Sequence, residues 1–563
     1  MEKVLFIYTR IPDGHFCPPS FGNSIHFAVS ERGEEYIPLN QNRGILYAKG
    51  EVSPENQIIE KGLAEPEAYP LPDGGFAILA KRTGQDGSVE NNGEAEWLLW
   101  LTHDFISFEE CGLTDLSQHP MLTELRAGEV KSYPPYPFPD VAAGCWLPIE
   151  TGLYEKLLRY YTPVCNTHMD IPKEISASCV EEIKDLSFTA HYSDGTTAQK
   201  KYDIPDVAQI DFAHPGTYTA TAVVRQKPYS FPLAVGFADP VIFFWDNKYY
   251  YIATNDNTDD VGFWVREAAQ VEDLFLPDAA QHLILDKDEE KKRLQTFWAP
   301  EFHVIGNRVY LLFAVSGDTF NPQCHMMRLK ENGSVTSADG WEEPVRVKKM
   351  DGTFLAVNGI TLDMTHFENG GRSYLIWSYR ENCMAEGDTG SMLYIAETNP
   401  DRPWMLKSDP VLLSRPLYGW ENVAGTINNE GPYPLITQEY IYIAFSGGAA
   451  CDWTYTVGLL RAGRDADLLD PESWEKSKFP ALATPDLDGV YGAGHNSFFK
   501  DRDGDTYIAY HGEITPYHSP RSTALHRVHF KETGEPVLNL SYERDIKEEY
   551  RKVNLNITVT GHK

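Results

Sequence analysis

The stretch ADPVIFFWDNKYYYIATND, residues 238–256, contains two short apolar strands separated by the turn residues WDNK. Strands rich in aromatic and β-branched residues on either side of an Asn- or Asp-containing turn indicate a β-hairpin. Four later stretches repeat this design: WAPEFHVIGNRVYLLFAVSG (298–317), ITLDMTHFENGGRSYLIWSY (360–379), NNEGPYPLITQEYIYIAFSGG (428–448) and GAGHNSFFKDRDGDTYIAYHG (492–512). The fold of this region is therefore built on a fivefold internal repeat.

Each repeat carries a polar residue near its start, and these residues are Asp239, Glu301, Asp363, Glu430 and His495. Their separations of 62, 62, 67 and 65 residues fit a four-stranded propeller blade with long loops. We therefore predict a five-bladed β-propeller over residues 236–540. A β-sandwich could also hold five hairpins, but it gives no reason for a polar residue at each strand start. In a propeller the first strand of every blade lines the central channel, so the five side chains should converge on one funnel.

Two further β-rich modules are predicted upstream, which makes the whole chain all-β. Residues 161–235 include DLSFTAHYSDGTTAQKKYDI and HPGTYTATAVV, whose strands and Ser-Asp-Gly turn resemble bacterial Ig-like β-sandwiches. Residues 1–160 contain weaker echoes of the blade, such as AEPEAYPLPDGGFAILAKRT, with Glu65 at the place of Asp239. We expect Glu65 to start a strand without a catalytic role.

Two segments of different character complete the organisation. The Pro-rich stretch YPPYPFPD (133–140) precedes YEKLLRYY (154–161), an amphipathic segment that predicts a short helix. Residues 541–563 follow the last repeat and are expected to form a C-terminal extension.

Composition excludes several classes of partner. The chain has 82 acidic and 49 basic residues, a formal charge of −33, which disfavours nucleic acid and anionic lipid as ligands and keeps the protein soluble. No stretch approaches the ~20 apolar residues that span a bilayer. The first residues, MEKVLFIYTRIPDGHF, lack the apolar core and cleavage site of a signal peptide, and the eight scattered cysteines form no CxxC pair. We expect free thiols and a cytoplasmic location.

Carboxyl groups that converge on a funnel suit glycoside hydrolysis. An inverting glycosidase uses one carboxylate to activate water and one carboxylic acid to protonate the leaving oxygen, about 6.5–9.5 Å apart. A third carboxylate nearby raises the pKa of the acid by like-charge repulsion. Asp239, Asp363 and Glu430 provide such a set, although each could instead serve a turn or bond only backbone.

The motifs of the repeats resemble family 43 of the glycoside hydrolases in order and spacing. They are ADP (238–240), WAPE (298–301), the Asp of ITLDMTHF, NNEGP (428–432) and GHNSF (494–498), and they extend over the whole repeat region. The resemblance implies that Asp239 is the general base, Glu430 the general acid, and Asp363 the residue that tunes the acid's pKa and orients it. The family usually has Pro after this third-blade Asp, whereas Met364 follows it here.

Other residues are candidates for binding sugar or metal. Trp298, Trp377, Trp420 and Phe297 fall near strand ends and could form the walls of sugar subsites, although each could equally be core. Glu301 is expected to orient substrate or support structure. The resemblance implies that Arg521, rather than Arg527, reaches substrate hydroxyls. It also implies that His495 lies by a hydrated ion, which in the family is often calcium, although a polar network with water is the alternative. No cofactor is required for the chemistry.

The function expected from these features is an inverting, exo-acting hydrolase that releases a terminal pentose, most readily α-L-arabinofuranose, from plant-derived oligosaccharides. A β-D-xylosidase of the same fold is one alternative, and a non-catalytic carbohydrate-binding propeller is another. A retaining glycosidase or a lyase would differ in its product. The sequence contains no feature that predicts an oligomeric state.

Overall fold

The computed structural model describes residues 3–84, 86–93, 96–127, 135–423, 426–484 and 486–560. The chain divides into two compact units, one of residues 1–162, 231–499 and 509–524, and a smaller one of residues 163–230, 500–508 and 525–563. Within the described ranges, no helix is long and apolar enough to cross a bilayer. All eight cysteines are described and none is in a disulfide, as the sequence predicted. Residues 133–134 of the Pro-rich stretch lie outside the described residues.

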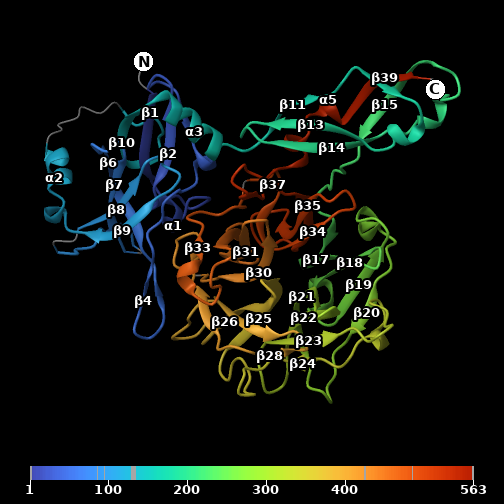
Figure 1. Ribbon diagram of the computed structural model, residues 1–563. Helices are drawn as coiled ribbons and strands as arrows, with labels where there is room; N and C mark the ends of the chain where they lie inside the picture. The colour runs from blue at the N-terminus through green and yellow to red at the C-terminus, as the bar shows by residue number, and fades with distance from the viewer. Residues whose placement is uncertain are drawn as a thin grey trace. The chain divides into compact units, whose positions relative to one another are not determined.

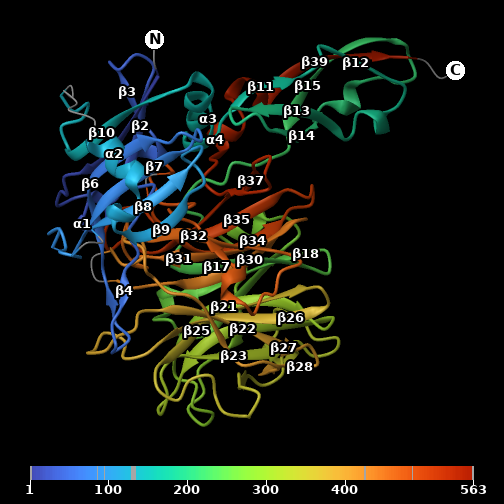
Figure 2. The same cartoon turned by 60° about the vertical axis from the view of Figure 1, so that its left-hand side comes forward.

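The chain forms a propeller of five sheets, most of whose residues belong to the larger unit, and this confirms the predicted repeat (Figure 1; Figure 2). The first two blades are β17 (Phe237–Trp245), β18 (Lys248–Asn255), β19 (Phe263–Ala268), β20 (His282–Leu285), and β21 (Gln295–Ile305), β22 (Arg308–Ser316), β23 (Gln323–Arg328), β24 (Val345–Arg346). The next two are β25 (Ile360–Asn369), β26 (Arg372–Arg380), β27 (Met392–Asn399), β28 (Arg402–Leu406), β29 (Val411–Ser414), and β30 (Glu430–Ile436), β31 (Tyr440–Gly447), β32 (Thr456–Gly463), β33 (Glu475–Lys476).

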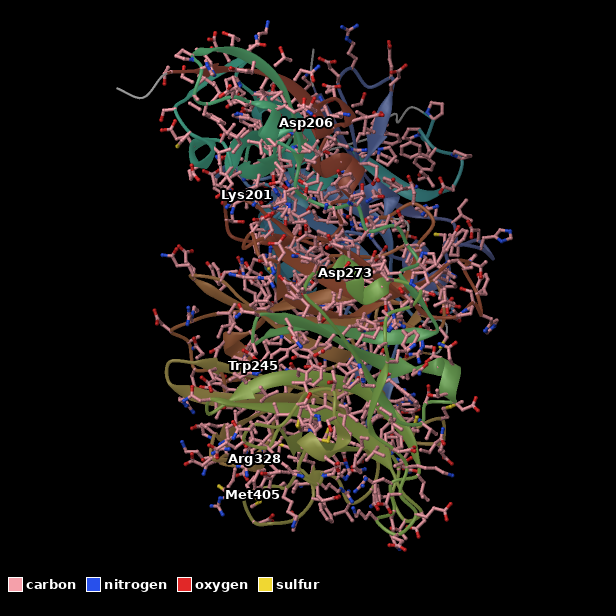
Figure 3. All side chains as sticks on the ribbon, turned by 90° about the vertical axis from the view of Figure 1, so that its right-hand side faces the viewer. Lys201, Asp206, Trp245, Asp273, Arg328 and Met405 are labelled. Carbon is pink, nitrogen blue, oxygen red and sulfur yellow. The ribbon has the colours of Figure 1, made fainter. Side chains whose placement is uncertain are left out.

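The fifth blade closes the ring with a strand from the beginning of the repeat region. Its order is β16-β36-β35-β34, in which β34 (Tyr491–Lys500), β35 (Thr506–Glu513) and β36 (Ser522–Arg527) come late in the chain. The outer strand β16 (Ala234–Val235) pairs antiparallel with β36, Ala234 opposite Thr523. Figure 3 labels Trp245 at the end of β17 and Arg328 at the end of β23. The ring is thus closed within one sheet, because the first strand of the propeller region pairs with a strand from its end.

The inner strand of each blade contains a residue with positive φ, which in the first four blades lies at an interruption of the strand pairing. These residues are Asp239 (53°), Ala299 (47°), Asp363 (54°), Gly431 (55°) and His495 (45°). In the first four blades the interruption is a register shift of the kind a β-bulge produces. The sequence had placed Glu301 and Glu430 in this same position, and that alignment is wrong. Glu301 follows the bulge residue of its blade by two positions, and Glu430 precedes its own by one.

The N-terminal residues contain one blade-like sheet and one smaller sheet. The blade-like sheet is β6 (Gly62–Pro70), β7 (Phe76–Thr83), β8 (Trp97–Thr102) and β9 (Glu109–Thr114). Its first strand has a register shift between Ala64 and Glu67, and Glu65 there has φ 51°. The segment around Glu65 therefore resembles a propeller blade in structure as well as in sequence.

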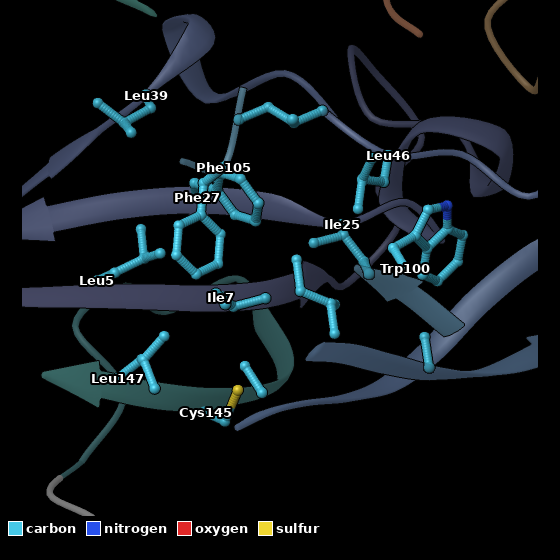
Figure 4. Close-up of a cluster of buried hydrophobic side chains, with 14 of the residues drawn as sticks. Leu5, Ile7, Ile25, Phe27, Leu39, Leu46, Trp100, Phe105, Cys145 and Leu147 are labelled. Carbon is cyan, nitrogen blue, oxygen red and sulfur yellow. The ribbon is translucent and has the colours of Figure 1, made fainter. Parts of the chain in front are cut away.

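The second N-terminal sheet has the order β10-β1-β2-β3, with β10 (Val141–Ile149), β1 (Lys3–Arg10), β2 (His26–Ser30) and β3 (Tyr36–Pro38). Around the two sheets lie the hairpin β4 (Glu51–Val52) and β5 (Ile58–Ile59) and the helices α1 (Pro19–Gly22), α2 (Pro120–Ala127) and α3 (Thr151–Tyr161). The helix predicted at 154–161 is thus part of α3. Buried side chains from both sheets, among them Ile7, Phe27, Trp100 and Leu147, form a common core (Figure 4).

Polar contacts join this N-terminal region to the propeller within the larger unit. Asp486 accepts hydrogen bonds from Arg43 Nη1 at 2.9 Å and Gln41 Nε2 at 2.5 Å. The Gly50 N–H donates to the Leu417 carbonyl at 2.7 Å. These contacts fix the N-terminal loops against the fourth and fifth blades.

The smaller unit forms a β-sheet module over most of the residues predicted to be Ig-like, and its likeness to Ig-like modules stays a prediction. Its strands, in the order β11-β13-β14-β15-β39-β12, are β11 (Asn166–Asp170), β13 (Leu186–Tyr192), β14 (Thr197–Asp203), β15 (Gly216–Val224), β39 (Lys552–Val559) and β12 (Glu174–Ala177). Only two residue pairs join β14 to β15, so two three-stranded halves meet at a narrow corner. Both halves contribute to one hydrophobic core.

The C-terminal residues belong to this module. The segment 541–563 was expected to be an extension, but β39 pairs with β15 over eight residue pairs and with β12 over four. The short elements β37 (His529–Phe530), β38 (Pro536–Val537), α4 (Tyr542–Asp545) and α5 (Glu548–Arg551) precede it. The boundary drawn from the sequence was wrong because the last strand of the sheet comes after the whole propeller in the chain.

Candidate active site

Asp239 lies in the bulge of the first blade, where several polar groups surround its carboxylate. Thr254 donates a 2.5 Å hydrogen bond to Oδ2, while His495 Nδ1 lies 3.1 Å and Arg521 Nη1 3.7 Å from Oδ1. The Asp239 N–H donates to His511 Nδ1 at 3.2 Å. Burial works against ionisation of Asp239, but its electrostatic interactions with His495, Arg521 and His511 outweigh it. The pKa of Asp239 is therefore held well below its usual range.

Arg521 supplies the lasting positive charge beside Asp239. Burial lowers the pKa of His495 to about 4, so this imidazole is neutral near pH 7. Arg521 is itself fixed by Asp256, which accepts from Nε at 3.0 Å and from Nη2 at 2.6 Å. Arg527, the alternative considered from the sequence, instead pairs with Asp545 inside the smaller unit at 2.8 and 2.9 Å. The structure thus favours Arg521 as the arginine of the channel.

Asp363 lies in the bulge of the third blade and is buried. Its Oδ2 accepts hydrogen bonds from the Gly431 N–H at 3.0 Å and from Ser378 Oγ at 3.3 Å. Burial, and next the charge of Glu430, raise the pKa of Asp363 well above its ordinary value. Asp363 and Glu430 therefore titrate as a coupled pair, which retains a proton to higher pH than either carboxyl would alone.

Glu430 is the first residue of β30 and is only partly buried. Its Oε1 accepts a 3.0 Å hydrogen bond from the Tyr455 hydroxyl. Burial raises the pKa of Glu430 to about 7, against the opposing effects of the Tyr455 hydrogen bond and the charge of Arg380. Arg380 is held by Asp388, which accepts from Nε at 2.8 Å and Nη2 at 2.7 Å. Near neutral pH a substantial share of Glu430 thus carries a proton that it could donate.

Glu301 occupies a different environment from the other carboxyls. It is 3% exposed, and its Oε2 lies 2.7 Å from His303 Nε2. The His303 ring packs near Tyr433 with centroids 5.8 Å apart, and burial raises the pKa of Glu301 well above its ordinary value. This carboxyl is part of a closed polar cluster, which favours its expected structural role over a contact with substrate.

The aromatic residues expected to line sugar subsites separate into two groups. Trp298 is partly exposed, and its Nε1 donates to Asp260 Oδ2 at 2.8 Å, so it remains a candidate wall. The other three are 0–2% exposed and packed in cores: Phe297, Trp377 and Trp420. Trp377 packs near Tyr394, and Trp420 donates to the Lys478 carbonyl at 3.2 Å. Their assignment to the sugar site is therefore corrected, because no face of these rings is accessible.

Comparison with known proteins agrees with this arrangement. Residues 229–536 match the family model described as glycosyl hydrolases family 43. The chain belongs to this family. The matched region covers the propeller, including Asp239, Asp363 and Glu430, and leaves the N-terminal sheets outside it.

Relatives of this family 43 glycoside hydrolase include proteins with named activities. The chain is 33% identical over 329 residues to an extracellular exo-α-(1→5)-L-arabinofuranosidase of Streptomyces chartreusis, covering 55% of this chain and 94% of the relative. It is 30% identical over 346 residues to α-L-arabinofuranosidase B of Pyricularia oryzae, covering 59% and 67%. A solved α-L-arabinofuranosidase from Lactobacillus brevis is 29% identical and covers 55% of this chain and 95% of its own, with a TM-score of 0.48.

Several residues of the family 43 site were not singled out from the sequence. Thr254, Arg380, Tyr455 and His511 contact or electrostatically tune the three carboxyls, and Glu513 lies beside Arg521. Burial, and next the charge of Asp452, raise the pKa of Glu513 to about 7. Most of these residues come from second strands or loops rather than from the repeated inner strands. Only the YHG motif that contains His511 carried a signal, because it ends the fifth repeat.

The residues around His495 do not form a direct calcium cage. Calcium prefers six to eight oxygen ligands. Among the described residues, the only three His, Cys, Asp or Glu donors that converge closely are His168, Asp170 and His191, on strands β11 and β13 of the smaller unit. At His495 the nearest carboxylate is Asp239, which is already engaged by Thr254. An ion held there through waters stays a prediction, and no step below depends on it.

Proposed function

We propose that this family 43 enzyme is an inverting, exo-acting α-L-arabinofuranosidase. The observation that carries the mechanism is the contrast between two carboxyls of one channel. The pKa of Asp239 is held well below its usual range, whereas that of Glu430 is raised to about 7. One carboxyl is thus ionised and the other protonated over the same pH range, which is the requirement for paired base and acid catalysis. The names of the relatives support arabinofuranose as the sugar released.

In the proposed reaction, Asp239 accepts a proton from a water molecule whose oxygen attacks the anomeric carbon. The bond between that carbon and the glycosidic oxygen breaks, and Glu430 donates its proton to the leaving oxygen. Asp363, fixed by the Gly431 N–H, raises the pKa of Glu430 through their coupling and holds it in place. The configuration at the anomeric carbon is inverted because water attacks from the face opposite the leaving group.

Substrate contacts are proposed for Arg521 and Trp298. The guanidinium of Arg521 is fixed by Asp256 beside the base, so it can donate to a sugar hydroxyl without reorganising. Trp298 offers a partly exposed ring held by Asp260. The chemistry needs no cofactor, and we propose no nucleic-acid or membrane partner. A cytoplasmic location stays a prediction, and the Streptomyces relative is named as extracellular.

Two alternatives concern the sugar and the catalysis itself. A β-D-xylosidase would use the same carboxyls, but the relatives' names favour arabinofuranose. A non-catalytic carbohydrate-binding propeller is opposed by the presence of all three carboxyls in one channel.

The test is hydrolysis of 4-nitrophenyl α-L-arabinofuranoside and β-D-xylopyranoside, together with α-1,5-linked arabino-oligosaccharides and xylo-oligosaccharides. We expect single arabinose units from the chain ends, with the β-anomer appearing first by NMR. The α-anomer in the first minutes would overturn the inverting mechanism. Release of xylose in place of arabinose would overturn the choice of sugar. Glu430→Ala protein serves as the control for contaminating hydrolases.

A further inference from the structure

A loop of the N-terminal region reaches a loop that borders the active site. After β1 ends at Arg10, residues 11–16 form an exposed loop in which Asp13 Oδ1 accepts from the N–H groups of His15 at 2.7 Å and of the buried Cys17 at 3.1 Å. Its Phe16 packs edge-on against Trp453 of the propeller, with ring centroids 4.9 Å apart. Phe16 is nevertheless 49% exposed, so one side of its ring faces solvent.

Trp453 belongs to a loop, residues 448–455, that contacts Glu430 directly and Asp239 through His511. The Ala450 carbonyl lies 3.3 Å from His511 Nε2, and the other ring nitrogen of His511 accepts the Asp239 N–H. At the far end of the loop, Tyr455 donates to Glu430. Phe16 is therefore two contacts away from the groups that act on the glycosidic bond.

A second exposed aromatic ring is attached to the same tryptophan. Trp453 Nε1 donates to the Tyr517 hydroxyl at 3.1 Å, and its backbone N–H donates to the Pro516 carbonyl at 3.0 Å. Tyr517 is 48% exposed and Ile514 is 53% exposed, whereas Trp453 is 6% exposed. The result is a pair of accessible rings on a buried tryptophan that fixes both.

We propose that Phe16 and Tyr517 form a subsite for the sugar on the leaving-group side of the bond that is cut. The inference rests on the proposed exo-arabinofuranosidase function. In an exo-acting pocket the terminal sugar is held deepest, so side chains at the rim meet the next units of the chain. Flat apolar rings beside polar groups are suited to sugar binding. Because Phe16 lies outside the family match of residues 229–536, the N-terminal region sets the preference for longer substrates.

The charge and polarity of the rim favour an oligosaccharide over a protein as the occupant. Polar groups adjoin both rings: Asp13 and His15 are exposed in the loop that carries Phe16, and Tyr517 has its own hydroxyl, which accepts from Trp453 Nε1. A protein contact of standard size would need a much larger apolar face than two rings and Ile514.

The experiment compares substrates that differ only beyond the arabinose that is released. For wild type, Phe16→Ala, Tyr517→Ala and the double variant, kcat/KM is measured on methyl α-L-arabinofuranoside, α-1,5-arabinobiose and arabinotriose. The methyl aglycone is too small to reach the rim. The expected result is that the ratio of kcat/KM on arabinotriose to that on the methyl glycoside falls roughly tenfold in each single variant.

Phe244→Ala is the matched control, since Phe244 is 43% exposed and lies near the end of β17 opposite to Asp239. It should keep the wild-type ratio. An unchanged ratio in the Phe16 and Tyr517 variants, or an equal loss on all three substrates, would overturn the subsite. If the wild-type protein hydrolysed none of the three arabinosides, the proposed function itself would be refuted. That test needs only the wild-type protein, so the two failures can be distinguished.

Discussion

The backbone N–H of Gly431 donates a 3.0 Å hydrogen bond to Oδ2 of Asp363. Gly431 directly follows Glu430, so this bond places the carboxyl of the third blade beside the first residue of β30. Gly431 has φ 55°, and a Cβ at this position would lie 3.0–3.2 Å from the His495 ring. Glycine is thus required where three blades meet, and a backbone N–H fixes the proposed catalytic carboxyl Asp363 beside Glu430.

Replacing the proposed acid tests its role directly. In Glu430→Gln the amide keeps the shape but cannot donate a proton as an acid, so kcat on arabinobiose should fall about 10²–10⁴-fold. The loss on 2,4-dinitrophenyl α-L-arabinofuranoside should be much smaller, because that leaving group needs little protonation. Glu439→Gln, an exposed glutamate beyond the other end of β30, is the control and should behave as wild type. Equal losses on both substrates would refute the assignment.

The pH dependence follows from the directions of the shifts. Glu430 must be protonated and its pKa is raised to about 7, so kcat/KM should fall as pH rises through about 7. Asp239 must be ionised and its pKa is lowered, so activity should persist below the usual range of an aspartate. Removing a coupled carboxyl lowers the pKa of its partner. Asp363→Asn should therefore move the alkaline limb to lower pH, and a limb that stays in place would contradict the coupling.

Tyr455→Phe should shift the same limb in the opposite direction. The Tyr455 hydroxyl stabilises ionised Glu430 through its 3.0 Å hydrogen bond and so lowers the pKa of Glu430. Without it, Glu430 should hold its proton to higher pH. The measurement is the pH profile of kcat/KM beside that of wild type. A downward shift would show that the hydroxyl acts in another way.

The corrected position of Trp420 can be tested by stability. Trp420 is 0% exposed in the core between the third and fourth blades, so Trp420→Ala should cost about 3–5 kcal/mol of unfolding free energy. Trp298→Ala, at a partly exposed ring, should lower kcat/KM with little change in Tm. Calorimetry and steady-state kinetics on both variants provide the comparison. A Trp420→Ala protein with native Tm and a raised KM would restore the sugar-binding interpretation.

The fivefold repeat could be predicted from the sequence because every blade begins with the same kind of β-hairpin. The sequence also predicted which carboxyls meet, since Asp239 and Asp363 lie in the first half of their inner strands and Glu430 is the first residue of its own. The direction in which each side chain points was harder to predict from the sequence. A bulge shifts the register by one residue, so Ala299 and Gly431, not the neighbouring glutamates, occupy the repeated backbone position. Trp377 and Trp420 were misjudged because a tryptophan near a strand end can point to a core between blades as readily as to the channel.

The closure of the ring by β16 and β36 has a consequence for biosynthesis. Roughly 290 residues separate these partners, so at about 5–20 residues per second a ribosome needs tens of seconds between making them. Until β36 has been made, the blades already synthesised have an open seam and unpaired strand edges, which are prone to aggregate. The β-sheet module of the smaller unit waits even longer, because β39 emerges last. Translation speed and chaperone supply should therefore limit the yield of this enzyme more than the stability of its finished fold.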